Sequence, residues 1–132
     1  MYCKRFPFVV EYGRFPYDIL WYWVSTAKGG GTLQFCTLFS GSSGNAVFLS
    51  TERGALLVDC GMSAKQTLEA MKLAGLDPAM VHAIVITHEH SDHVKGVGVM
   101  SRKLGIPVYA TAGTWEGMGA SLGELPDRNR VV

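Results

Sequence analysis

Three histidines and one aspartate lie close together in the segment Thr87-His88-Glu89-His90-Ser91-Asp92-His93, and the whole chain contains only four histidines. Imidazole and carboxylate groups are ligands for divalent ions such as zinc, manganese and iron. His88 and His90 are two positions apart in an expected extended turn, so both rings can face one ion. Asp92 and His93 are adjacent on the first turn of an expected helix and can reach a second ion about 3.5–4 Å away. The spacing therefore predicts a site for two divalent metal ions.

Two other interpretations of this segment are possible. It can be a polar helix-capping turn, with Ser91 or Asp92 as the N-cap and the histidines exposed. It can also bind a single structural zinc, but such a site usually takes four ligands in closed tetrahedral geometry, often with cysteine. Cys3, Cys36 and Cys60 are widely spaced and odd in number, so neither a thiolate cluster nor a disulfide framework is indicated.

The remaining candidate residues have more open interpretations. Asp59 ends an expected strand, where it can orient a metal-bound histidine or simply close a turn. Cys60 follows it and could reach the same rim. We expect His82 at the opposite end of its strand, on the surface, and Glu89 facing solvent. The loop Ser40–Asn45 is either a hairpin loop or a set of N–H groups for a phosphate, and it lacks the Gly-Lys-Ser/Thr of a P-loop.

Alternating strands and helices must position these residues. The pattern predicts strands over 33–39, 46–50, 55–59, 83–87 and 108–110, and helices over 64–74, 92–104 and 114–122. Ser63 and Gln66 form a capping box for the first helix, and Gly75 can end it in the left-handed conformation. The histidine segment then lies between a buried strand and a helix, where α/β sheets form ligand sites. The order predicts an α/β fold with helices covering a largely buried sheet.

The composition of the chain changes at Gly29-Gly30-Gly31. Residues 1–31 hold most of the aromatic side chains, whereas residues 32–132 are poor in them. We therefore expect 1–31 to be an aromatic-rich N-terminal extension and 32–132 to be the domain. The extension either docks on the domain through its aromatic side chains or is disordered, with no fold of its own.

The overall composition limits the possible functions. The chain of 132 residues has a formal net charge of +1, which gives no support for a broad basic surface that binds nucleic acid by charge alone. A metal centre can still supply local positive charge. We find neither a membrane-spanning stretch nor a signal peptide in the pattern, and we expect a cytoplasmic protein with reduced cysteines.

Three segments together resemble the metallo-β-lactamase superfamily, and more narrowly its YycJ/WalJ-type branch. They are Phe39–Asn45, Leu56–Gly61 and Thr87–His93. The resemblance covers about residues 33–130 and does not reach 1–31. It implies a four-layer αββα sandwich with the active site at the edge between two sheets, of which this chain would hold the N-terminal half. It also implies exonuclease activity on DNA.

The resemblance also implies roles for the site residues. His88 and His90 would bind one metal, and Asp92 and His93 the other. Asp59 would support the site, so Asp59 and Asp92 are the expected catalytic residues. Zinc is the preferred metal, with manganese or iron as alternatives, and a metal-activated hydroxide would attack phosphorus or a carbonyl carbon.

The sequence departs from the family pattern after His93. Members of the family take further ligands from later positions, namely another histidine, a bridging aspartate and a final histidine. This chain has no histidine after His93, and its remaining acids are Glu116, Glu124 and Asp127. We expect the N-terminal part of a longer domain, which alone binds metal weakly and turns over little or nothing. The alternatives are a hydrolase of RNA, thioester or lactone substrates, and a non-catalytic metal-binding module.

Overall fold

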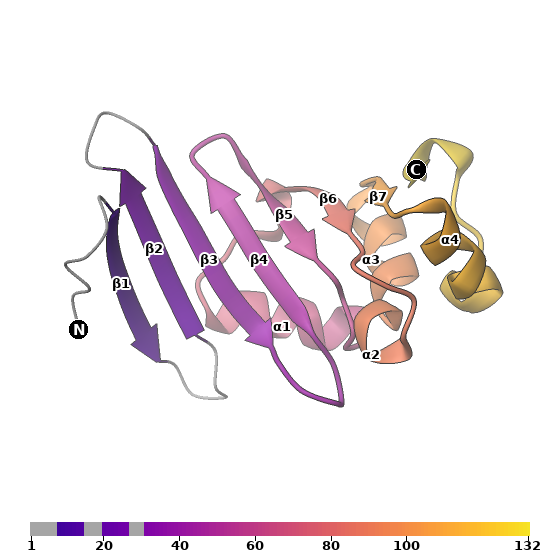
Figure 1. Cartoon of the computed structure of the whole chain (residues 1–132), viewed down its shortest axis with the longest axis horizontal. Coiled ribbons are helices and arrows are strands. Elements are labelled where there is room, and N and C mark those ends of the chain that lie inside the picture. The colour runs from indigo at the N-terminus through magenta and orange to yellow at the C-terminus, as the bar shows by residue number, and fades with distance from the viewer. Residues whose placement is uncertain (1–7, 15–19, 27–30) are drawn as a thin grey trace.

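The computed structural model describes residues 8–14, 20–26 and 31–132, and for the first two ranges it describes the backbone alone. Within these residues one mixed sheet contains the strands in sequential order (Figure 1). Pairing is antiparallel from β1 to β5 and parallel from β5 to β8. The strands are β1 Phe8–Arg14, β2 Leu20–Thr26, β3 Thr32–Phe39, β4 Ala46–Thr51, β5 Gly54–Val58, β6 Val81–Val85, β7 Val108–Tyr109 and β8 Arg130–Val131.

The backbone of β1 and β2 continues the sheet beyond β3, which the sequence did not lead us to expect. β2 pairs antiparallel with β3, and β1 pairs antiparallel with β2. Residues 1–7, 15–19 and 27–30 lie outside the described residues, as do all side chains before residue 31. The division into an extension over 1–31 and a domain over 32–132, and the docking of the extension through aromatic side chains, therefore remain predictions.

The first predicted helix is confirmed to within one residue. The helices are α1 Ala64–Leu73, α2 Ser91–Val94, α3 Val97–Leu104 and α4 Ala112–Met118. The Ser63 side chain accepts from the backbone N–H of Gln66, and the side chain of Gln66 accepts from the backbone N–H of Ser63, which completes the capping box. Gly75 follows the helix with a φ of 70°, the left-handed conformation that glycine adopts without strain.

The prediction of one helix over 92–104 is wrong, because the chain bends between α2 and α3 at Lys95-Gly96. The N–H of Gly96 donates to the carbonyl of Cys60 at 2.8 Å. A side chain on Gly96 would overlap the carbonyl of Met62, so the backbone segments approach too closely for any other residue. The predicted helix over 114–122 is likewise divided, since α4 ends at Met118 and a 3-10 turn follows over Gly119–Leu122.

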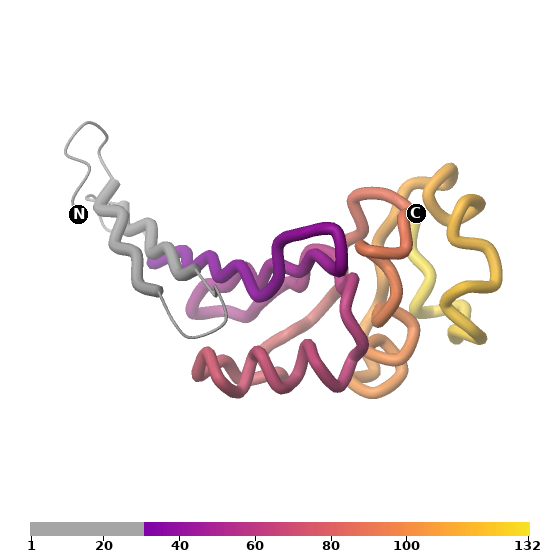
Figure 2. The backbone as a smooth tube through the Cα atoms, turned by 90° about the horizontal axis from the view of Figure 1, so that it is seen from below, coloured from indigo at the N-terminus to yellow at the C-terminus, as the bar shows by residue number. Residues whose placement is uncertain are grey.

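The helices and the sheet form two layers. Figure 2 shows α1 running along one face of the sheet, where it contacts β3 and α3. Phe48, Leu57 and Ile84 are buried on this side. The opposite face exposes Leu56, which is 37% accessible, and Tyr109, which is 43% accessible. The described residues thus form one sheet with α1 and α3 on one face, as expected for half of a four-layer sandwich.

Strand ends place the candidate site at one edge. β5 ends at Val58 and is followed by Asp59, and β6 ends at Val85, two residues before Thr87. These strands are parallel, with Val58 beside Val85, so both following segments leave the sheet on the same side. The fold therefore brings Asp59 and the histidine segment together at the carboxyl ends of the strands, where ligand sites form in α/β sheets.

Candidate metal centre

Backbone hydrogen bonds join three segments at the site: the loop Ser40–Asn45, the residues after β5 and the start of α2. The N–H of Asn45 donates to the carbonyl of Asp92 at 2.8 Å, and the N–H of Cys60 donates to the carbonyl of His93 at 2.8 Å. Gly61 closes the junction by donating to the carbonyl of Asn45 at 2.9 Å. A side chain on Gly61 would overlap the Asp92 carbonyl. The backbone around the candidate ligands is therefore fixed by close contact.

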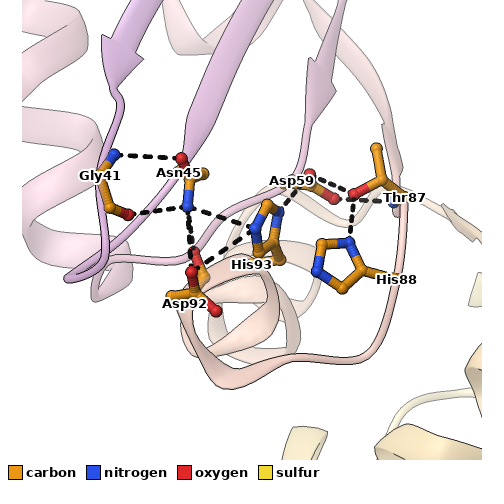
Figure 3. Close-up of polar contacts among 7 residues, drawn as sticks. All are labelled: Gly41, Asn45, Asp59, Thr87, His88, Asp92 and His93. Atoms are coloured by element: carbon orange, nitrogen blue, oxygen red, sulfur yellow. Dashed lines mark hydrogen bonds and ion pairs between the residues drawn. The ribbon is translucent and has the colours of Figure 1, made fainter.

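Asp59 anchors His93 at the centre of this junction (Figure 3). Asp59 has a φ of 59° and is 5% accessible. Its Oδ2 lies 2.7 Å from His93 Nδ1. An ionised carboxylate can only accept, so Nδ1 carries the proton and the Nε2 lone pair is free to face a metal. This geometry allows the supporting role expected of Asp59, which stays a prediction.

Thr87 extends the same arrangement to His88. The backbone N–H and the hydroxyl of Thr87 both donate to Asp59, at 2.8 Å and 2.7 Å. The hydroxyl oxygen also lies 3.0 Å from His88 Nδ1. Because the single hydroxyl hydrogen is donated to Asp59, the oxygen accepts from Nδ1–H of His88, and Nε2 is again the free nitrogen. Asp59 thus orients His93 directly and His88 through Thr87.

Asp92 and His93 have the spacing of two ligands on one ion. His93 Nε2 and Asp92 Oδ2 are 3.6 Å apart. Two ligands that each lie about 2.1 Å from an ion at a tetrahedral angle are separated by about 3.4 Å. Both side chains are half-buried at the start of α2. We call Asp92 and His93 the ligand pair.

The remaining two histidines approach the ligand pair without completing a site. The His88 ring centroid lies 4.0 Å from that of His93 and 4.6 Å from that of His90. The exposed His90 ring makes no side-chain hydrogen bond to any described residue. Within residues 31–132, no group of three or more His, Cys, Asp or Glu side chains is arranged to hold a metal ion. The donor types suit a divalent ion, but their geometry accounts for only part of its coordination shell.

The side chains of the other candidate residues take no part in the hydrogen-bonded cluster. Cys60 is fully buried, with its sulfur 3.4 Å from the Thr67 hydroxyl, and burial raises the pKa of its thiol to about 11. A neutral, buried thiol is a poor metal ligand. The side chain of Cys60 therefore does not reach the edge of the site, where it could have been a ligand. His82 and Glu89 are both exposed, as predicted. His82 lies within β6 and packs against Gly54, at the other end of the strand from the cluster.

Sequence reasoning missed two residues that contact the predicted ligands, Thr87 and Asn45. The side-chain amide nitrogen of Asn45 lies 3.3 Å from Asp92 Oδ2 and 3.2 Å from His93 Nε2. The signal for Thr87 was its position directly before His88 at the end of a buried strand. Asn45 gave no such local signal, because it is 47 residues from Asp92 in the sequence.

Curated relatives match most of this chain. It is 44% identical over 100 residues to a protein of Bacillus anthracis named exodeoxyribonuclease YycJ, and this match covers 76% of the chain and 38% of the relative. It is 46% identical over 101 residues to exodeoxyribonuclease WalJ of Streptococcus pneumoniae, covering 75% of the chain and 38% of the relative. The chain thus spans about two fifths of the length of these relatives.

A solved structure and a family model agree on the fold. A metallo-β-lactamase of Cronobacter sakazakii with a HARLDQ motif superimposes with a TM-score of 0.56 at 24% identity, covering 62% of this chain and 30% of that one. This level of identity supports the fold alone. The family model of the metallo-β-lactamase superfamily matches residues 40–129, a range that includes Asp59 and the whole histidine segment. The chain belongs to the metallo-β-lactamase superfamily, and the fold predicted from its sequence is confirmed.

Proposed function

We propose that this chain forms part of the metal centre of a hydrolase that cleaves phosphodiester bonds in DNA as an exonuclease. The observation that carries the proposal is the hydrogen-bonded group of Asp59, Thr87 and His93, which leaves His93 Nε2 unprotonated 3.6 Å from Asp92 Oδ2. A buried carboxylate that orients a histidine in this way is typical of metal sites. The names of the two bacterial relatives support DNA as the substrate.

We propose two divalent ions as cofactors, with zinc preferred and manganese or iron as alternatives. His88 and His90 would hold one ion, and the ligand pair would hold the other. When bound, the ions would lower the pKa of water and offset negative charge on the phosphate. Asp59 contributes by keeping the free nitrogen of His93 directed at the site, and Asp92 contributes its carboxylate oxygen.

Four ligands are too few for two ions, since each ion usually binds about four groups with one position left for water or substrate. The described side chains add no further ligand at the cluster. We therefore propose that segments of a longer protein supply the rest, in keeping with the length of the relatives. The exposed apolar face around Leu56 and Tyr109 would be the place where a second sheet packs.

DNA is the proposed partner, and we place the protein in the cytoplasm because Cys36 and Cys60 are buried free thiols. The net charge of +1 makes the metal centre, rather than a basic surface, the main source of attraction for phosphate. No helix among the described residues has the length and apolar character needed to cross a membrane.

Release of labelled nucleotides from DNA tests this proposal. The 132-residue chain and a version extended at its C-terminus are assayed with zinc or manganese, beside the same proteins carrying Asp92→Ala. We expect activity in the extended protein, its loss with Asp92→Ala, and little or none from the chain alone. Strong activity from the 132 residues would contradict the incomplete site.

A substrate panel on the extended protein separates the alternatives. Cleavage of RNA or of a thioester, with DNA left intact, would replace DNA as the proposed substrate. Tight zinc binding by the folded 132-residue chain, with no hydrolysis from either version, would instead favour a non-catalytic metal-binding module.

A further inference from the structure

Asn45 contacts both the ligand pair and the loop Ser40–Gly44, which we call the glycine-serine loop. Its side-chain carbonyl accepts from the N–H of Gly41 at 3.2 Å, and its amide nitrogen donates to the Gly41 carbonyl at 2.9 Å. The same nitrogen lies 3.3 Å from Asp92 Oδ2 and 3.2 Å from His93 Nε2 (Figure 3). One side chain therefore joins the loop to both members of the ligand pair.

The amide of Asn45 has more acceptors within reach than it has hydrogens. It carries two hydrogens. Its nitrogen lies within hydrogen-bonding distance of the Gly41 carbonyl, the Asp92 carbonyl at 3.4 Å, Asp92 Oδ2 and His93 Nε2. The backbone of Asn45 is held separately, by its N–H on the Asp92 carbonyl. The side chain can therefore redistribute its bonds while the residue stays in place.

The state of His93 Nε2 determines which acceptors the two amide hydrogens of Asn45 can bond to. Its Nδ1–H is committed to Asp59, so Nε2 has a single lone pair. That lone pair can accept from Asn45 or bind an ion, but it cannot do both. Asp92 Oδ2 has further lone pairs and can do both. When an ion binds His93 Nε2, the N–H of Asn45 that pointed at this nitrogen must turn to another acceptor. The acceptors within reach are Asp92 and the Gly41 carbonyl.

We propose that Asn45 is a positioning residue that couples occupation of the ligand pair to the conformation of the glycine-serine loop. This proposal rests on metal binding at the ligand pair. Ser42 and Ser43 are exposed on the loop, so its conformation changes the surface that a substrate would meet beside Asp92. Because coupling is reciprocal, a change in the loop also changes metal affinity.

Nuclear magnetic resonance of the ¹⁵N-labelled 132-residue chain, titrated with zinc, tests the coupling. The reporter is the backbone amide of Gly44, which donates to the Gly41 carbonyl at 3.3 Å. In the unchanged chain, zinc should shift this resonance and the side-chain NH₂ resonances of Asn45. In Asn45→Ala the Gly44 shift should vanish, and zinc affinity should rise, because the amide that competes for the Nε2 lone pair of His93 is gone. Ser42→Ala is the matched control and should behave as the unchanged chain.

Two results would overturn the coupling. One is a Gly44 response to zinc in Asn45→Ala as large as in the unchanged chain. The other is an Asn45 NH₂ signal that stays constant while zinc saturates His93. The second observation needs no variant, so it holds even if Asn45→Ala fails to fold.

A metal-free arm separates this proposal from metal binding itself. If the unchanged chain takes up no zinc, the proposed metal centre fails, but the coupling can still be measured by a double-mutant cycle. Asp92→Ala should speed hydrogen exchange at Gly44 about threefold or more when Asn45 is present. It should have no further effect in the Asn45→Ala background. Equal effects in both backgrounds would overturn the coupling.

Discussion

The two predicted pairs of ligands differ in how firmly the chain holds them. In the ligand pair, His93 is anchored to buried Asp59 at 2.7 Å, and its Nε2 lies 3.6 Å from Asp92 Oδ2. In the other pair, His88 is oriented only through Thr87, and His90 has no side-chain hydrogen bond to a described residue. The chain therefore fixes the side chains of the ligand pair more firmly than those of His88 and His90.

Packing explains this difference. Backbone hydrogen bonds hold the ligand pair in place, since the N–H of Cys60 donates to the carbonyl of His93 and the N–H of Asn45 donates to the carbonyl of Asp92. His90 instead occupies the N-cap of α2 and projects from an exposed turn. Preorganised ligands bind more tightly because less conformational entropy is lost on binding. The first ion should therefore bind at Asp92 and His93.

Gly61→Ala should have the largest effect, because a Cβ there overlaps the Asp92 carbonyl and would force the junction apart. We expect a loss of about 3 kcal/mol or more in the free energy of unfolding, measured by denaturant titration. Gly113→Ala is the control, since a Cβ on this exposed glycine of α4 meets nothing within 4 Å. It should stabilise the chain by about 0.5 kcal/mol. Equal free energies of unfolding for the two variants would contradict the claim that close backbone contact at Gly61 holds the ligand pair in place.

Asp59→Asn should have the next largest effect. The asparagine keeps the shape, but its NH₂ group would replace either Oδ2, which accepts from His93 Nδ1–H and the Thr87 hydroxyl, or Oδ1, which accepts from the Thr87 backbone N–H. We expect a loss of about 2 kcal/mol in stability and a shift of His93 to the other tautomer. Metal affinity should fall about 10–100-fold by calorimetry. An unchanged tautomer in ¹⁵N spectra of the imidazole would contradict the anchoring role of Asp59.

Thr87→Val should have a smaller effect that is confined to His88. Valine has a similar size but no hydroxyl, so His88 Nδ1 loses its partner while His93 keeps its bond to Asp59. We expect a loss of about 1 kcal/mol in stability and a mixture of His88 tautomers. Thr87→Ser, the control, should restore both. If Thr87→Ser fails to restore stability and the His88 tautomer, the assigned role of the hydroxyl is contradicted.

His90→Ala should have the smallest effect on the fold. Its exposed ring makes no side-chain hydrogen bond to a described residue, so stability should change by less than about 0.5 kcal/mol. Zinc binding at the ligand pair should also be little changed, and Glu89→Gln provides the matched exposed control. A large loss of stability or affinity in His90→Ala would show that the two pairs are held alike.

The sequence was most informative where the interactions are local. The capping box of Ser63 and Gln66 and the turn at Gly75 lie within one helix, and both were predicted. The break at Gly96 was missed because it depends on contact with Cys60 and Met62, more than thirty residues earlier in the chain. Such long-range backbone contacts leave no periodic pattern in the sequence.

The candidate site shows the same limit. The histidine segment and Asp59 could be identified from residue type and strand position. The hydroxyl of Thr87 became significant only when its hydrogen bonds to Asp59 and His88 were visible. Asn45 lies in a loop with typical turn residues, and nothing in its sequence neighbourhood indicates contact with Asp92. Tertiary contacts of this kind require the fold.

Calorimetric zinc titration of the 132-residue chain, beside His93→Ala and His90→Ala, tests the central claim most directly. We expect one ion per unchanged chain, bound weakly because few ligands are present, with binding abolished by His93→Ala and retained by His90→Ala. Two tightly bound ions, or equal losses in both variants, would contradict a centre in which the chain preorganises Asp92 and His93 alone.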